Sequence, residues 1–218
     1  MNGQYIYLLV LLSFLVLIFF LQKKYQLLAD SGTNSIKKAY SLSRTQLVWW
    51  SFIVLSTIVA IVIGSGKLPK LTESTLVLLG IGALTTISSR LTDISDDKKA
   101  AGNGTTAQIS RNDSTGNFLL DILSDNEGVS IHRLQSVVFN LIFGVWFMYK
   151  VMIEIKGISP CITGVNNMIP NFDKSNLIMM GISSGTYIAL KTTENAHLSL
   201  PITKPDTQTT NTVADTNC

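Results

Sequence analysis

The chain has 218 residues, of which 46% are hydrophobic and 14% are charged, and its formal net charge is +3. The basic residues lie beside the apolar segments rather than along one face, so this charge does not predict nucleic-acid binding. Two cysteines are too few for a disulfide framework or for a cysteine-based zinc site.

Five apolar runs predict an all-α fold, a polytopic transmembrane helical bundle whose first partner is the lipid bilayer. The first run, residues 5–21, approaches the thickness of a bilayer's hydrocarbon core, about 30 Å. Lys23 and Lys24 follow it, no basic residue precedes it and no A-x-A cleavage site is present, so we interpret it as an uncleaved signal-anchor. The other four predicted spans are residues 47–63, 76–87, 137–155 and 177–190.

The distribution of Lys and Arg predicts the orientation of these spans. If the first span runs from outside to inside, most of the basic residues fall in the inner segments. Because Lys and Arg in short loops stay on the cytoplasmic side, we expect the N-terminus outside and the C-terminus in the cytoplasm.

Two segments have too few apolar residues to offset the entropy cost of ordering them. They are residues 93–117, expected to be a mobile inner loop, and the tail after Glu194, expected to be disordered. Between the loop and the fourth span, residues 118–123 predict a short amphipathic helix. Asp121 and Asp125 disfavour an anionic lipid surface, so we expect this helix to dock on protein.

The strongest signal is an internal repeat. The segment Ser41-Leu-Ser-Arg-Thr-Gln46 precedes the second span, and Ser130-Ile-His-Arg-Leu-Gln135 precedes the fourth; a second pair of matching segments leads into the third and fifth spans. Both copies enter from the inside, which predicts two parallel-repeat helix hairpins related by an axis along the membrane normal. The signature residues are Ser41, Arg44, Gln46 and Pro69 in the first copy and Ser130, Arg133, Gln135 and Pro170 in the second.

Local signals predict how these helices begin and pack. Ser43 and Gln46 have the spacing of a capping box, and Thr72 and Asp173 are expected N-caps of the returning helices. Residues 181–185 form a GxxxG motif, which favours close approach of helix backbones in lipid.

These repeated motifs, S-L-S-R-x-Q with L-L-G-I and S-x-H-R-x-Q with M-G-I-S-S-G-T-Y, resemble a group of uncharacterised bacterial multi-pass membrane proteins. The resemblance covers about two-thirds of the chain, residues 40–194. It implies a location in the bacterial inner membrane and carries no activity with it.

The predicted organisation therefore has five parts. They are residues 1–39, a signal-anchor span and inner linker; 40–91, the first hairpin; 92–129, the cytoplasmic loop and short amphipathic helix; 130–192, the second hairpin; and 193–218, the cytoplasmic tail.

The residue patterns of catalysis and cofactor binding are weak. Residues 64–67, Gly-Ser-Gly-Lys, lack the spacing of a phosphate loop and are better explained as a turn. Neither His132 nor His197 has the neighbours of a metal or acid/base site, and Lys150 and Glu154 are expected to form an interfacial pair. We expect no cofactor, no metal and no enzymatic activity.

Small and polar residues within the spans admit two interpretations. They either pack helices together or line a water-filled path, and packing is narrowly favoured. They are Gly80, Gly82, Thr85, Thr86, Asn140, Gly181, Ser183, Ser184, Gly185 and Thr186.

Three functional hypotheses follow. The first is a homo-oligomeric pore or channel-like assembly, because a few short, Gly-rich helices bury little surface without neighbours. The second is a non-conducting membrane anchor or scaffold that recruits a cytoplasmic protein. The third and weakest is a small-solute transporter that uses the interface between the repeats.

Overall fold

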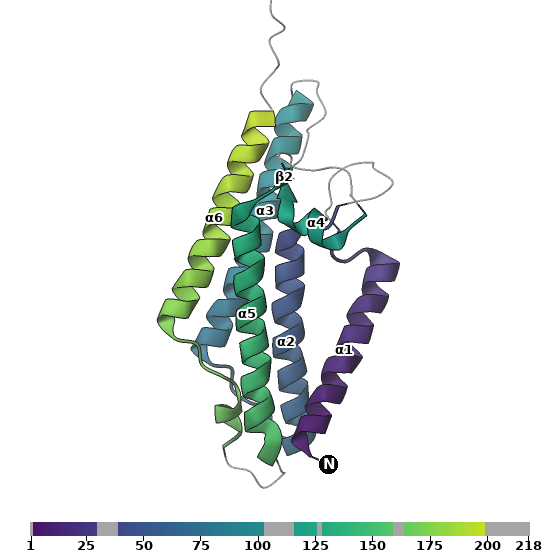
Figure 1. Cartoon of the computed structure of the whole chain (residues 1–218), viewed down its shortest axis with the longest axis vertical. Helices are drawn as coiled ribbons and strands as arrows, with labels where there is room; N and C mark the ends of the chain where they lie inside the picture. Colours follow the sequence, from purple (N-terminus) through teal and green to yellow (C-terminus); the bar gives the residue numbers. More distant parts are fainter. Residues whose placement is uncertain (1, 30–38, 103–115, 126–127, 159–163, 199–218) are drawn as a thin grey trace, which may run out of the picture.

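The computed structural model describes residues 2–29, 39–102, 116–125, 128–158 and 164–198 (Figure 1). The described chain is all-α apart from one hairpin of two-residue strands. Its helices are α1 (Gly3–Tyr25), α2 (Leu42–Ser65), α3 (Glu73–Gly102), α4 (Phe118–Leu123), α5 (Ile131–Glu154) and α6 (Lys174–Leu198). The strands are β1 (Ser124–Asp125) and β2 (Gly128–Val129), and two 3₁₀ turns, η1 (Ile155–Gly157) and η2 (Val165–Met168), follow α5.

Four helices are long and apolar enough to cross a membrane. They are α1, α2, the Glu73–Thr92 part of α3, and the Ile131–Gly157 segment that contains α5. The protein is therefore a multi-pass membrane protein in contact with the bilayer. The predicted fifth span lies within α6, but α6 is not one of these four helices, because Gly, Ser and Thr interrupt its apolar residues.

The helices form one bundle around two central parallel members. Figure 1 shows α2 and α5 running in the same direction, with α3 and α6 returning beside them and α1 lying against α2 at one end only. The centre is closely packed: Trp50, Ile53, Ile61, Leu78, Phe147 and Val151 are all buried. The turns at residues 66–72, 155–158 and 164–173 lie toward the end of the bundle that carries the N-terminus. This end is called the outer end after the orientation that the sequence predicts; α4 and the β1–β2 hairpin lie toward the opposite, inner end.

A loop residue completes the aromatic core. Phe172, just before α6, is buried among the rings of Trp50, Phe143, Trp146 and Phe147, with ring centroids 5.1–6.2 Å away. Its backbone N–H donates to Ser74 Oγ at 3.0 Å, so the second outer turn is tied to the start of α3.

Both returning helices are longer than the predicted spans. α3 continues through Gly102, into the stretch where a loop was expected, and α6 continues to Leu198. Residues 93–101 contain neither Gly nor Pro, so nothing in their backbone chemistry stops a helix already formed by the apolar residues before them. The first residues of the expected tail, 195–198, are therefore helical, whereas residues 103–115 of the expected loop, residues 199–218 of the expected tail, and Cys161 lie outside the described residues.

The short helix α4 forms where the sequence predicts it and docks on protein. Ile122 is 3% exposed and packs with Leu42 and Tyr187, residues of α2 and α6. Asp121 is also buried.

Candidate functional site

At the inner end, Arg44 fastens the start of α2 to the segment that follows α1. Its Nη1 donates to the carbonyl of Ala29 at 2.6 Å. The backbone N–H of Ser41, the residue before α2, donates to the carbonyl of Leu28 at 2.8 Å. Ala29 also forms an isolated antiparallel bridge with Tyr40.

Arg133 does the same at the start of α5. Its Nη1 donates to the carbonyl of Ser124 at 2.9 Å, and the N–H of Ser130 donates to the carbonyl of Leu123 at 2.9 Å. Ser124 pairs with Val129 in the β1–β2 hairpin. Arg133 is buried and its guanidinium lies 5.6 Å from the ring of Tyr187, within the range of a cation–π interaction.

The expected capping box at Ser43 is wrong. The N-cap of α2 is Ser41, and its side chain makes no capping hydrogen bond; its Oγ lies 3.2 Å from Ser43 Oγ. Gln46 points into the bundle instead, where its Nε2 donates to Ser184 Oγ on α6 at 3.1 Å. Leaving the side-chain amide of Gln46 buried without a partner would cost more free energy than leaving a backbone N–H at the helix start to bond with water. By contrast, Gln135 is exposed on α5.

The other expected caps hold. The N–H of Thr75 donates to Thr72 Oγ1 at 3.3 Å, so Thr72 caps α3. Asp173 directly precedes α6, and its carbonyl accepts from Asn176 and Leu177. Ser130 is the N-cap residue of α5, without a side-chain cap, and its Oγ lies 2.6 Å from Nδ1 of His132.

The threonines that the sequence assigns either to helix packing or to a water-filled path bond to backbone carbonyls. Thr85 donates to Ile81, and Thr186 donates to Ile182, each one turn back in its own helix. Thr86 Oγ1 lies within hydrogen-bond distance of two carbonyls, that of Gly82 in its own helix and that of Ser43 in α2, at 3.1 Å. These contacts suit the packing interpretation.

The two serines of α6 lie inside the bundle. Ser183 and Ser184 are both buried, and Ser184 accepts from Gln46. Ser183 Oγ, Ser136 Oγ and Gln46 Oε1 have no hydrogen-bond partner among the described residues.

Asn140 joins α5 to α2. Its Oδ1 accepts from Trp50 Nε1 at 2.6 Å, and its Nδ2 donates to the carbonyl of Ser136 at 2.7 Å. Its backbone carbonyl accepts from Trp49 Nε1 at 3.0 Å. Both indoles of the Trp-Trp pair are therefore bonded to one residue, which the sequence did not predict because the partners lie ninety positions apart.

Glycines allow close approach at places other than the predicted ones. A Cβ on Gly144 would overlap the Trp49 indole. By contrast, Gly80 and Gly185 face open space, and Cβ atoms on Gly82 and Gly181 would make only ordinary contacts, so within one protomer the GxxxG motif does not bring backbones together.

α3 and α6 are also joined near the inner end. Lys191, although buried, donates from Nζ to Ser89 Oγ at 2.6 Å.

The outer turns form a second polar region. Ser74 Oγ donates to Asn171 Oδ1 at 2.6 Å, and the N–H of Lys70 donates to Asn166 Oδ1 at 3.0 Å. Pro69 is buried and Pro170 half-buried. A pocket of about 460 Å³ opens here, lined by Thr72, Trp146, Lys150, Glu154, Asn166, Asn167, Ile169, Pro170 and Asn171.

The turn interpretation of residues 64–67 fits only from Gly66 onward, because Gly64 and Ser65 are the last residues of α2. Gly66 ends α2 with φ of 68°, a conformation that favours glycine, and its N–H donates to the carbonyl of Val62. Within the described residues, no three His, Cys, Asp or Glu side chains gather as a metal site.

Comparison with known proteins identifies no relative. No protein-family model, no curated protein and no solved structure matches this chain.

Proposed function

We propose that the protein is a membrane anchor that presents the inner ends of α3 and α6 to a cytoplasmic protein partner. The observation that carries this proposal is the length of α3. Its 30 residues extend to about 45 Å at 1.5 Å per residue, against about 30 Å for the hydrocarbon core. The last third of α3 therefore extends beyond the hydrocarbon core, and this part is rich in Asp and Lys.

The second hairpin completes the proposed anchor as a fifth span. α6 has 25 residues; it begins partway along α5, lies beside α3, and continues past the start of α5 (Figure 1). Two of its polar side chains are bonded internally, since Ser184 Oγ accepts from Gln46 and Thr186 Oγ1 donates to the carbonyl of Ile182, whereas Ser183 Oγ has no partner among the described residues. A helix whose polar side chains are satisfied within the bundle crosses lipid at lower cost than its composition alone suggests.

We infer that the two hairpins are copies of one unit. Support comes from the matching contacts at the start of each hairpin. Arg44 and Arg133 each donate to a backbone carbonyl of the segment upstream. In both copies the backbone N–H of the serine before the helix, Ser41 or Ser130, donates to the carbonyl of the residue just before that acceptor. On this basis each copy of the unit also includes the upstream segment that is bonded to the start of its long helix, Leu28–Ala29 in the first copy and Leu123–Ser124 in the second.

The proposed location is a bacterial inner membrane, with the N-terminus outside and the C-terminus in the cytoplasm. The bias of Lys and Arg supports this orientation, and the resemblance of the duplicated motifs supports the location. In this orientation the extension of α3 lies in the cytoplasm, where a soluble partner can reach it.

An oligomeric pore is the second candidate. The observation in its favour is the outward side of α6, where Gly185 faces open space and Thr186 is exposed. A neighbouring copy packed there would cover both residues. Against it, Thr85, Ser183 and Ser184 are buried within one protomer.

A small-solute transporter is the third candidate, and the one observation in its favour is the pocket of about 460 Å³ at the outer turns. That pocket joins Thr72 of the first hairpin to Trp146 and Asn171 of the second, so it lies at the interface between the proposed repeats. Its aromatic and amide lining suits a small polar solute.

Two measurements separate the anchor from the pore. In planar bilayers, the purified protein is expected to pass no ions; a conductance altered by Thr186→Ile would favour the pore. In cells, a photo-crosslinking residue at the exposed position Ser95 is expected to give one discrete protein adduct. The same residue at Leu84, exposed on the membrane part of α3, is the matched control and should give none. Equal labelling at both positions would contradict the anchor.

A further inference from the structure

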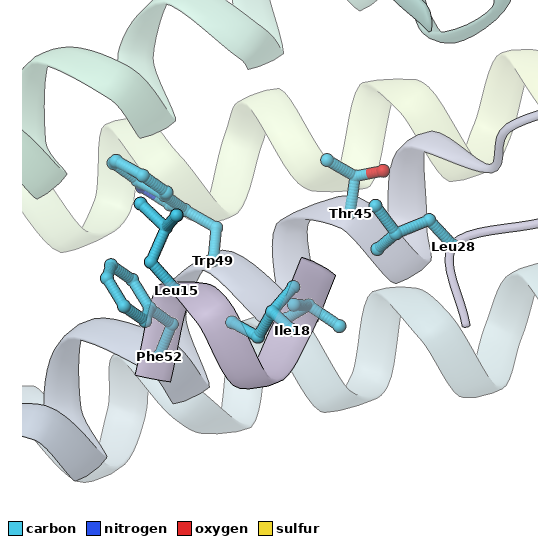
Figure 2. A pocket seen from close by; sticks show the side chains of 7 residues that line it. Leu15, Ile18, Leu28, Thr45, Trp49 and Phe52 are labelled. Carbon is cyan, nitrogen blue, oxygen red and sulfur yellow. The ribbon is translucent and has the colours of Figure 1, made fainter. Parts of the chain in front are cut away.

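α1 and α2 meet at the outer end and separate toward the inner end, which leaves a crevice between them (Figures 1 and 2). Its volume is about 190 Å³. Figure 2 shows Leu15 near Phe52 and Trp49 at one end and Leu28 near Thr45 at the other. Leu15 and Ile18 come from α1, and Val48 lies between Thr45 and Trp49 on α2.

The crevice is a fixed feature because α1 is held at both of its ends. At the outer end, Gln4 Nε2 donates to the carbonyl of Met152 at 3.1 Å, and a Cβ on Gly3 would overlap the carbonyl of Ile155. At the inner end, Leu28 and Ala29 accept from Ser41 and Arg44. Between these points the helix stands away from the bundle, and Leu15 remains 57% exposed.

The lining of the crevice suits a hydrocarbon chain. Among the described residues that line it, only Thr45 and Trp49 carry polar side-chain groups. Both groups are already bonded, Thr45 Oγ1 to the carbonyl of Ser41 at 2.8 Å and Trp49 Nε1 to the carbonyl of Asn140 at 3.0 Å. Both walls belong to candidate membrane spans, so the crevice opens to lipid rather than to water. An unfilled gap between apolar side chains loses dispersion contacts that an acyl chain restores.

The two helices that border the crevice carry basic residues at their inner ends. Lys23 and Lys24 are exposed in the last turn of α1, and Arg44 lies in the first turn of α2, beside Thr45. Basic residues at a bilayer surface attract anionic lipid by about 1 kcal/mol each.

We propose that this crevice binds one acyl chain of an anionic phospholipid, drawn from the leaflet on the Lys23 side, with the phosphate held by Lys23 and Lys24. A second copy of the protein is a poorer occupant. A helix with its side chains is about 10 Å wide, too wide for a gap of this volume whose two walls are tied together at both ends. The proposal requires membrane insertion but neither the anchor role nor the pore.

Trp49 provides a probe within the site, since its indole lines the crevice. The delipidated protein in mild detergent is titrated with phosphatidylglycerol or phosphatidylcholine that carries bromine in mid-chain. We expect saturable quenching of tryptophan fluorescence at one lipid per protomer, with phosphatidylglycerol bound about tenfold more tightly. Native mass spectrometry should find one retained anionic lipid.

Two variants test the two halves of the site. Lys23→Gln with Lys24→Gln should abolish the headgroup preference and leave chain-dependent quenching. Val48→Phe should fill the crevice and abolish saturable quenching, whereas Leu55→Phe, at an exposed position of the same helix, should not.

Three results would overturn the proposal. They are quenching that rises without saturation and equally for both headgroups, retention of lipid in Val48→Phe, and cross-linking of Ile18→Cys between two copies.

Discussion

Trp50 Nε1 donates a 2.6 Å hydrogen bond to Asn140 Oδ1 in the buried contact between α2 and α5. The two parallel central helices are thus joined by a polar bond in an apolar interior. Replacing Asn140 with Ala removes the acceptor and leaves the indole N–H buried.

We expect Asn140→Ala to lower the free energy of unfolding by about 1–2 kcal/mol, measured by denaturant titration in mixed micelles. Leu141→Ala, at an exposed neighbouring position, should cost less. A double-mutant cycle with Trp50→Phe should give a coupling energy of about 0.6 kcal/mol or more. Strict additivity of the two changes would contradict a direct bond.

Gly144 and Gly80 form a matched pair. Gly144→Ala should destabilise the bundle by about 1–3 kcal/mol, because its Cβ would overlap the Trp49 indole. Gly80→Ala meets open space in the middle of α3 and should raise stability by up to about 1 kcal/mol through helix propensity. Thermal unfolding of the two variants in detergent measures both changes, and equal shifts would count against the close contact at Gly144.

Phe172 is the third position to test. Phe172→Ala should cost about 3–5 kcal/mol, because the side chain fills the space between four aromatic rings. Phe172→Leu keeps most of the buried area and should cost less. Tyr149→Ala, at a residue 61% exposed on α5, is the control. Denaturant unfolding that ranks Tyr149→Ala above Phe172→Ala would be incompatible with the core described above.

The two arginines should act separately on their own upstream segments. Arg133→Ala should raise the rate of amide hydrogen exchange about tenfold at Ser130, whose N–H donates to the carbonyl of Leu123 just before β1. Arg44→Ala should do the same at Ser41. Each variant serves as the control for the other, and exchange that rises at both sites in either variant would argue against two independent units.

The sequence predicted the helices better than the contacts between them. Residues 47–63 and 137–155 fall almost entirely within α2 and α5, because a continuous apolar run is a local property. The ends of α3 and α6 were underestimated, since Ala, Lys and Glu favour a helix without making it strongly apolar.

The contacts that hold the bundle together were largely missed. Phe172 reads as a loop residue after Pro170, yet it lies in the core, and Asn140 was assigned to packing without its two indole partners. Gln46 fitted a capping box by spacing but bonds to Ser184 on another helix. In each case the deciding partner is distant in sequence, so no local pattern identifies it.

The central claim is that the two ends of the bundle lie on opposite sides of a membrane. Single cysteines replace Lys70 in the outer turn and Ser95 in the extension of α3, both exposed, in a chain whose Cys161 and Cys218 are changed to Ser. Intact cells are treated with a membrane-impermeant maleimide. We predict labelling at position 70 and none at position 95 until the cells are permeabilised; labelling of both positions in intact cells would contradict the account.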